Sequence, residues 1–166
     1  MAAVTQPDSH LRIAPANLDD PAEAQALLEL IEAYAREPIG LGRALDRGVR
    51  AVLIDRLRAH PATEAHLCRL GPEPVGYAIT LLSFSTFKAA SVLNIHDLAV
   101  LSGHRGRGVG RAILDYLHER ACQSGCCKLT LEVREDNPAQ RLYRRAGFGP
   151  GDANEHFWTK WCRNEP

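Results

Sequence analysis

The sequence predicts a mixed α/β (α+β) domain in which helices cover a sheet, and three observations support this fold class. The chain has 166 residues, which suits one domain over residues 1–166, with residues 1–9 expected to be a flexible tail. Its segments show either strand-like or helix-like apolar spacing. They follow one another as strand, two helices, three strands, helix, strand, helix, strand. That order favours a sheet flanked by helices.

The N-terminal half is predicted to form a strand, two helices and a β-hairpin. Asp20 and Pro21 suit a helix start, because aspartate caps the first amides and proline fits the first turn. The turn 71–74 joins two segments rich in strand formers, so we expect them to pair as a hairpin. The expected elements are a strand at 11–16, helices at 21–37 and 43–59, and strands at 63–70 and 75–84.

A glycine-rich, basic turn at 104–111 connects an apolar strand at 92–100 to a predicted helix at 109–121. The helix has apolar residues at positions 109, 113, 114, 117 and 121, which form an amphipathic stripe. Glycine lets the backbone approach a ligand closely, and the free N–H groups and dipole of a helix start favour an anion. The turn therefore predicts a site for a phosphorylated ligand.

Two familiar phosphate-binding loops do not match this turn. A nucleoside-triphosphate loop has Lys followed by Ser or Thr after its last glycine, whereas Arg111 and Ala112 follow Gly110. A dinucleotide loop has the spacing G-x-G-x-x-G, whereas the glycines here are spaced G-x-G-x-G. The spacing that fits is R-x-x-G-x-G, which begins at Arg105.

A second motif follows a predicted strand at 128–133. Asn137 is a good helix cap, Pro138 suits the first helical position, and Gly147 suits a left-handed stop. These residues predict a helix of about two and a half turns. The alternating segment 155–162 is expected to be the last strand.

The two motifs resemble those of the GNAT superfamily of N-acetyltransferases. Residues 105–110 are similar to its coenzyme A pyrophosphate loop. Residues 136–148 are similar to its second signature, N-x-x-A-x-x-L-Y-x-x-x-G-F, although Asn137 lies one residue too close to the alanine. The residues in register are Ala139, Leu142, Tyr143, Gly147 and Phe148. The resemblance implies a splayed mixed sheet of about six to seven strands, flanked by about four helices.

The resemblance also implies acetyl-CoA as co-substrate, with no metal, and direct transfer of its acetyl group to an amine. The backbone of 98–100 would hold the pantetheine arm, and the amides of the turn would hold the pyrophosphate. Arg105 and Arg107 would add charge, although Arg107 fits a solvated surface position equally well. The expected coenzyme-binding residues are Leu98, Ala99, Val100, Arg105, Gly106, Arg107, Gly108, Val109, Gly110, Arg111, Asn137 and Tyr143.

Amine attack on a thioester needs a proton acceptor for the amine and a donor for the departing thiolate. Tyr143 matches the tyrosine that is the donor in many family members. His96 and Asp97 occupy the place where the diamine acetyltransferase group has Glu-Asp, and His96 is either a base or a packed histidine. Because successive strand residues point to opposite faces, we expect only one of the pair to face the cleft. Glu132, on the neighbouring strand, is a further candidate.

The acceptor side has several open alternatives. The segment 83–88 is similar to the small-amine subgroup, and Phe84 and Phe87 either line the acceptor pocket or belong to the core. Glu32 and Glu37 either recognise a cationic acceptor or form a solvated helix face. We expect an N-acetyltransferase for a small-molecule amine. The alternatives are a protein α-amine or lysine acetyltransferase and a regulatory module that binds acyl-CoA without turnover.

Composition argues against several function classes. The chain has 20 basic and 20 acidic residues, so it has no overall basic field for nucleic acid. No apolar run is long enough to cross a membrane, and the N-terminus does not have the pattern of a secretory signal. Five cysteines without paired C-x-x-C spacing favour a reducing cytoplasm. Relatives are often homodimers, so the resemblance implies a homodimer.

Overall fold

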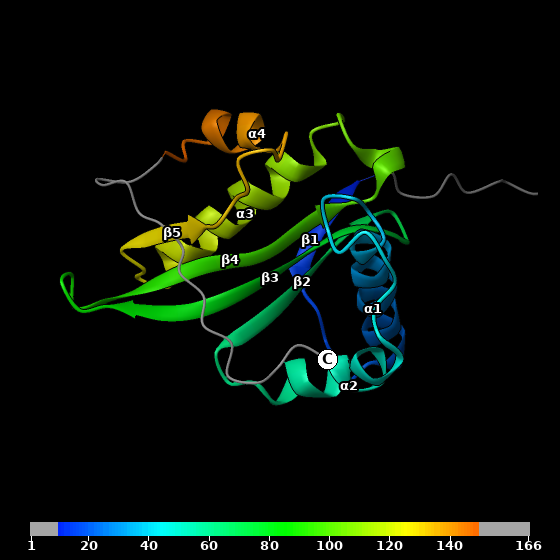
Figure 1. Cartoon of the computed structure of the whole chain (residues 1–166). Helices are drawn as coiled ribbons and strands as arrows, with labels where there is room; N and C mark the ends of the chain where they lie inside the picture. Colours follow the sequence, from blue (N-terminus) through cyan, green and yellow to red (C-terminus); the bar gives the residue numbers. More distant parts are fainter. Residues whose placement is uncertain (1–9, 150–166) are drawn as a thin grey trace, which may run out of the picture.

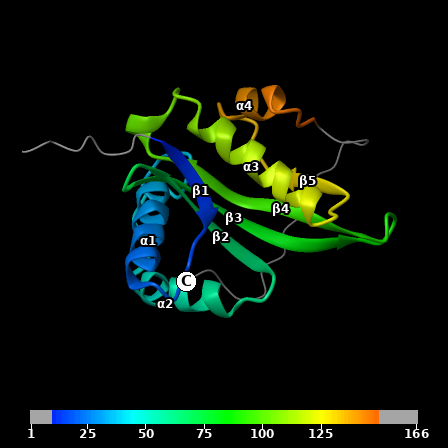
Figure 2. The same ribbon diagram turned by 180° about the vertical axis from the view of Figure 1, so that it is seen from behind.

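The computed structural model describes residues 10–149, which form a five-stranded sheet with helices on both faces (Figures 1 and 2). The strands are β1 (Leu11–Pro15), β2 (Thr63–Leu70), β3 (Glu73–Ser85), β4 (Ala90–Val100) and β5 (Lys128–Leu131). The helices are α1 (Pro21–Ala35), α2 (Arg47–Ala59), α3 (Val109–Gln123) and α4 (Gln140–Arg145), with a 3-10 turn η1 (Ser102–His104). The predicted fold class is confirmed. The sequence predicts about six to seven strands, and its last one, at 155–162, lies outside the described residues.

The sheet has the order β1-β2-β3-β4-β5 and is mixed. Strands β1 to β4 pair antiparallel, and β5 runs parallel to β4. β5 pairs with β4 only from Val92 to Ile95, whereas β3 stays paired with β4 as far as Val100. Among residues 10–149, the second half of β4 therefore has one open edge, as expected for the splayed sheet that the resemblance implies.

Two apolar clusters pack against the two faces of the sheet. On one face, α3 buries the five positions of its predicted stripe, Val109, Ile113, Leu114, Leu117 and Ala121. On the other face, α1 buries Leu27 and Leu30 against Tyr77 of β3. The sheet is thus held between α3 on one side and α1 on the other.

Several element boundaries differ from the sequence prediction, and two of them have a clear local cause. α2 begins at Arg47 rather than at 43, because the Asp46 side chain accepts the Gly48 amide and caps the helix there. α4 begins at Gln140, since the Asn137 side chain caps a tight turn by accepting the Ala139 amide at 2.9 Å. β5 ends at Leu131, two residues earlier than expected.

Candidate active site

The turn before α3 carries a row of backbone amides without acceptors. Gly106 and Gly108 have φ angles of +72° and +86°, in the left-handed region that glycine tolerates. A Cβ atom on either glycine would meet no atom within 4 Å, so the space beside both is open. Within residues 10–149, the N–H groups of residues 106–111 donate to no acceptor. Unpaired amides at a helix start suit an anion such as a diphosphate.

The open edge of β4 lies next to this turn. The Leu101 amide donates to the Val75 carbonyl at 2.9 Å. The backbone groups of Leu101 therefore point toward β3. Because hydrogen bonds alternate along an antiparallel ladder, the backbone groups of Leu98 and Val100 point away from β3, toward the open edge. Those of Ala99 pair with β3 instead. Of the three residues expected at the pantetheine arm, two therefore present backbone groups to the open edge.

The Arg105 side chain is bound to protein groups on two sides. Its Nε donates to the Val100 carbonyl at 2.7 Å. Its terminal nitrogen donates to both carboxylate oxygens of Glu37, at 2.5 and 2.7 Å. This geometry differs from the predicted contact between the Arg105 guanidinium and the pyrophosphate.

The other two arginines of the turn differ from each other. The Arg111 guanidinium donates to Asp115 at 2.8 Å and to the Arg145 carbonyl at 2.9 Å, so it ties α3 to the end of α4. Arg107 is exposed, and the described part of the chain offers it no ion pair. Arg107 is thus the arginine of this turn whose charge remains available to a ligand.

Neither glutamate proposed for acceptor recognition has an unpaired carboxylate. Glu37 binds Arg105, as described above. Glu32 pairs with Arg36 at 2.8 Å and accepts the Leu45 amide at 3.3 Å, so it holds the segment between α1 and α2. Both side chains act within the protein, which differs from both alternatives that the sequence left open.

A β-bulge places His96 and Asp97. Thr80 of β3 pairs with Ile95, whereas the preceding Ile79 pairs with Asp97, so His96 is one extra residue in β4. Such a bulge interrupts the regular direction of side chains along a strand.

The faces of β4 confirm the interruption. Ile95 packs in the α3-side cluster and Ala99 in the α1-side cluster, although strict alternation would put both on one face. The premise of strict alternation was therefore wrong here, and it does not decide between His96 and Asp97. Burial separates them instead, because His96 is exposed and Asp97 is partly buried.

Asp97 lies among phenol groups from two other elements. Burial raises the pKa of the Asp97 carboxyl above its usual range, and the neighbouring His96 lowers it in part. Burial also raises the pKa values of Tyr34, on α1, and Tyr77, on β3, and the charge of Asp97 raises both further. Three elements thus bring a carboxyl and two phenols together.

Tyr143 lies on α4, across from Tyr34. Its ring makes an edge-on contact with Phe148, with ring centroids 6.1 Å apart, and packs against the α3-side cluster. Burial raises the pKa of Tyr143, and the nearby Tyr34 raises it further. The phenol therefore stays protonated at neutral pH, as a proton donor must.

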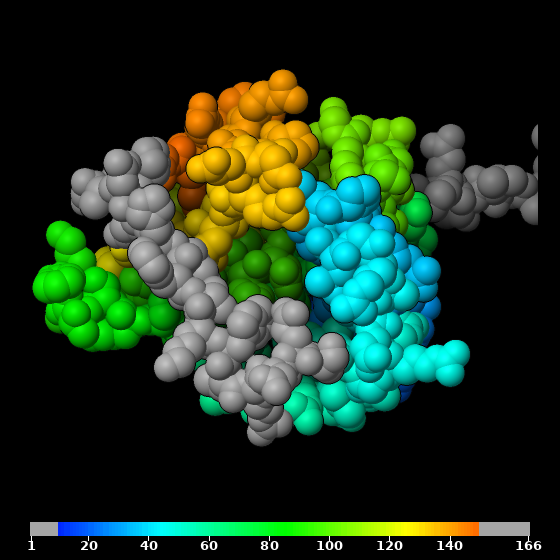
Figure 3. Space-filling view, viewed as in Figure 1, coloured from blue at the N-terminus to red at the C-terminus, as the bar shows by residue number. Residues whose placement is uncertain are grey.

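The molecular surface is hollowed over the sheet (Figure 3). The floor of this hollow is green, the colour of β3 and β4, and it is bordered by the orange-yellow segment after β5 and the blue-to-cyan segment after α1.

The remaining candidate residues for the acceptor side and for the base have other surroundings. Phe84 and Phe87, at the end of the β3–β4 hairpin, are 64% and 98% exposed, which matches neither a pocket wall nor a core. The Glu132 carboxylate accepts the Asn94 amide at 3.1 Å.

The comparison with protein families decides the family. The model of the acetyltransferase (GNAT) family matches residues 46–148, which is more than half of the chain. The chain belongs to the GNAT family of acetyltransferases.

Curated relatives of this GNAT chain act on different amines. Thialysine N-epsilon-acetyltransferase of Bos taurus is 36% identical over 78 residues, which cover 46% of this chain and 45% of that protein. [Ribosomal protein bS18]-alanine N-acetyltransferase of Haemophilus influenzae is 32% identical over 88 residues, which cover 52% and 55%. The chain thus spans about half the length of each relative.

A solved structure shares the fold. An integron cassette protein from the mobile metagenome of V. cholerae superposes with a TM-score of 0.77 at 19% identity, covering 92% of this chain and 93% of that one. At this identity the likeness shows the fold alone.

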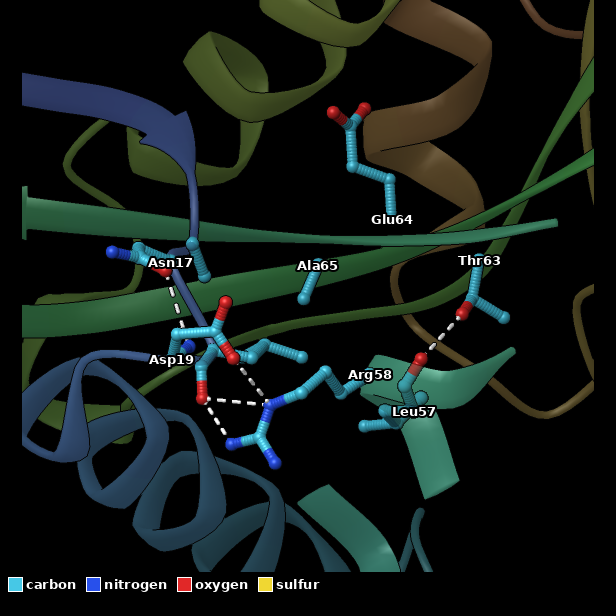
Figure 4. A pocket seen from close by; sticks show the side chains of 9 residues that line it. Asn17, Asp19, Leu57, Arg58, Thr63, Glu64 and Ala65 are labelled. Carbon is cyan, nitrogen blue, oxygen red and sulfur yellow. Dashed lines mark hydrogen bonds and ion pairs between the residues drawn. The ribbon is translucent and has the colours of Figure 1, made fainter. Parts of the chain in front are cut away.

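A pocket of about 270 Å³ lies elsewhere on the GNAT domain, between β2, α2 and the segment before α1 (Figure 4). Its Arg58 is paired with Asp19 at 3.0 Å. Glu64 points to the opposite side of β2, where it binds Arg120 at 2.7 Å. Its charged groups are therefore already paired. Within the described residues no helix is long and apolar enough to span a membrane, and no group of three metal-ligating side chains is present.

The sequence pattern does not distinguish Tyr34 and Tyr77 as site residues. Tyr34 follows helical spacing on α1 and Tyr77 lies in an apolar strand, so both match the pattern of core residues. Only the packing of α1 across β3 and β4 brings their hydroxyl groups near Asp97.

Proposed function

We propose that the chain is an acetyl-CoA-dependent N-acetyltransferase for a primary amine of a small molecule. The observation that carries this proposal is that the unpaired amides of residues 106–111 follow directly from the open edge of β4, beside Asp97 and Tyr143. A diphosphate binder, an extended edge for the pantetheine arm, a base and an acid thus adjoin one hollow.

The coenzyme binds along this path. The amides of residues 106–111 hold the pyrophosphate with Arg107 beside it, and each charge-assisted hydrogen bond contributes on the order of 1.5–3 kcal/mol. The backbone of Leu98 and Val100 binds the amides of the pantetheine arm. The thioester then lies at the bulge, between Asp97 and Tyr143.

In the reaction, Asp97 takes a proton from the bound ammonium group, directly or through water. The freed amine nitrogen attacks the thioester carbonyl carbon, and a C–N bond forms while the C–S bond breaks. The new amide nitrogen then releases its extra proton to solvent. Tyr143 gives its proton to the departing thiolate and takes one back from solvent. The raised pKa of Asp97 makes this carboxylate a stronger base than an exposed aspartate.

The thialysine relative supports a small-molecule acceptor, and the partly buried carboxylate of Asp97 favours a cationic amine over a neutral one. The ribosomal-protein relative supports a second candidate, a protein α-amine. The cysteines of residues 10–149 are all unpaired, which agrees with a reducing cytoplasm. We also propose a homodimer, which light scattering tests.

A screen tests the activity and the acceptor class together. The protein is incubated with acetyl-CoA and a panel of diamines, amino acids and peptides, and thiol release is followed. We expect release with small cationic amines and little with peptides. Release only with peptides would establish the protein acceptor instead. Calorimetry that detects no coenzyme A binding would contradict the whole proposal.

A further inference from the structure

Arg105 joins two parts of the molecule that are far apart in sequence. Its backbone lies at the start of the amide row, directly before Gly106. Its guanidinium reaches Glu37, 68 residues earlier, through two hydrogen bonds of 2.5 and 2.7 Å, and also holds the Val100 carbonyl. One guanidinium nitrogen thus contacts both carboxylate oxygens, while Nε holds the end of β4.

Glu37 in turn organises the segment 36–46 between α1 and α2. Its carbonyl accepts the amides of Gly40 and Gly42, at 2.9 and 3.0 Å. Gly40 packs so tightly that a Cβ atom there would lie 2.3 Å from the Tyr34 carbonyl. The position of Glu37 therefore determines that of the turn after α1 and of the helix end that carries Tyr34.

This segment borders the hollow (Figure 3). The Tyr34 phenol lies near both Asp97 and Tyr143, on the side where the acceptor must reach the thioester. A displacement of the α1 end would change the shape of the acceptor side without touching the coenzyme.

We propose that the Glu37–Arg105 ion pair couples the coenzyme loop to the segment 36–46, so that coenzyme binding orders the acceptor side of the hollow. This inference rests on the proposed function. A diphosphate bound to the amides fixes the backbone of Arg105, and its guanidinium then holds Glu37. Glu37 is a positioning residue, because its carboxylate acts through Arg105.

The exposure of the Glu37–Arg105 ion pair suits it to coupling the two segments rather than to stabilising the fold. The Glu37 side chain is 24% exposed and that of Arg105 is 46% exposed. Ion pairs of this exposure contribute little to stability by themselves, because side-chain entropy and solvent screening offset the attraction. The contact therefore opens and closes in the free protein, and fixing one partner shifts that equilibrium.

Amide hydrogen exchange with coenzyme A as the probe tests the coupling. In the unmodified protein, we expect coenzyme A to slow exchange at residues 106–111 by direct contact. We also expect slower exchange at Gly40 and Gly42, by about five-fold or more, the lower end of typical coupling between sites. In Glu37→Gln, coenzyme A should still slow exchange at residues 106–111 but should no longer slow it at Gly40 and Gly42.

Glu29→Gln is the matched control, because Glu29 lies on the neighbouring helix α1 and binds Gln25 instead of Arg105. This variant should retain the protection at residues 106–111 and at Gly40 and Gly42.

A thermal melt of Glu37→Gln checks that the variant is folded. Arg105→Lys keeps the charge, but its single nitrogen cannot hold Val100 and Glu37 as two guanidinium nitrogens do, so this variant should also lose the protection at Gly40 and Gly42.

The outcomes separate the two proposals. Absence of protection at residues 106–111 would reject coenzyme binding at this turn. Protection there, without a change at Gly40 and Gly42, would reject the coupling alone. Faster exchange at Gly40 and Gly42 would also reject it, since it would mean that the diphosphate draws Arg105 away from Glu37. If coenzyme A still slowed exchange at Gly40 and Gly42 in Glu37→Gln, the coupling through this ion pair would be rejected as well.

Discussion

Asp97 of β4 and Tyr143 of α4 each have a raised pKa for the same reason. Burial disfavours the charged form of both groups. The raised pKa of Asp97 increases the basicity of its carboxylate. The raised pKa of Tyr143 keeps its phenol protonated at neutral pH.

Tyr143→Phe removes the proposed acid and leaves the ring packing in place. We expect turnover to fall about ten-fold or more, because the thiolate then leaves without a proton donor. Coenzyme affinity, measured by calorimetry, should change little. Tyr116→Phe, on α3, is the control and should keep full turnover. A weaker affinity with unchanged turnover in Tyr143→Phe would reject the acid role.

Asp97→Asn should lower activity and raise stability. Activity should fall about 100-fold or more, as expected for loss of a general base. The folded-state pKa of Asp97 is raised, so its ionised form destabilises the fold at pH 7, and that penalty disappears as pH falls toward its unfolded value of about 3.9. Urea unfolding should therefore show a gain for Asp97→Asn at pH 7 that shrinks in acid.

His96→Ala distinguishes the two candidate bases. Because His96 lowers the pKa of Asp97, its removal should move the acidic limb of the kcat/KM profile to higher pH without abolishing it. Loss of that limb would identify His96 as the base, contrary to the proposal.

The α3 helix supplies two functions from one element. Its interior stripe is local in the sequence, so the spacing alone predicts it, and all five positions are buried. Its start lies at the end of the open half of β4, and only this placement puts the free amides beside the proposed path of the pantetheine arm. Two glycines of the preceding turn have left-handed φ angles.

Gly108→Val should therefore weaken coenzyme A binding by about ten-fold or more. A β-branched residue resists a φ of +86°, at a cost of about 1–2 kcal/mol, and its side chain would occupy the space beside the amides. Gly103→Ala is the control, because Gly103 also meets no neighbour within 4 Å but lies outside the left-handed region. Calorimetry with equal affinities for the two variants would contradict the loop assignment.

Across the whole molecule, a buried polar chain connects α3 to the sheet. The His66 ring, which is 1% exposed, lies 3.1 Å from the Thr80 hydroxyl and 3.5 Å from that of Tyr116. Arg120 of α3 binds the Glu64 carboxylate at 2.7 Å on the same side. These polar residues are remote from the unpaired amides of residues 106–111, so we expect their substitution to change stability rather than coenzyme binding.

Stability should fall with acid because of His66. Burial lowers the pKa of His66 from 6.5 to about 4, so the unfolded chain binds its proton first. The contribution of neutral His66 to the free energy of unfolding is complete above pH 6.5. It is lost as pH falls to about 4, by at most about 1.4 kcal/mol per pH unit. In His66→Gln, the free energy of unfolding measured in urea should not show this decrease with pH. His118→Gln, an exposed site, should retain it, and identical slopes in all three proteins would contradict the assignment.

The sequence alone predicts those helix starts and stops that depend on capping residues and on glycine or proline. Asp20 and Pro21 start α1 as predicted, Gly147 stops α4 with a φ of +93°, and the glycine turn precedes α3. Family resemblance then assigned the coenzyme loop and Tyr143.

Tertiary structure alone decided which groups meet. The bulge at His96 depends on the register between β3 and β4, and the neighbours of Asp97 come from α1 and β3. The contact between Arg105 and Glu37 spans 68 residues. Spacing along the chain determines which face of an element is apolar, because that periodicity is local. Distances between elements depend on how the faces pack, and no short segment of sequence contains that information.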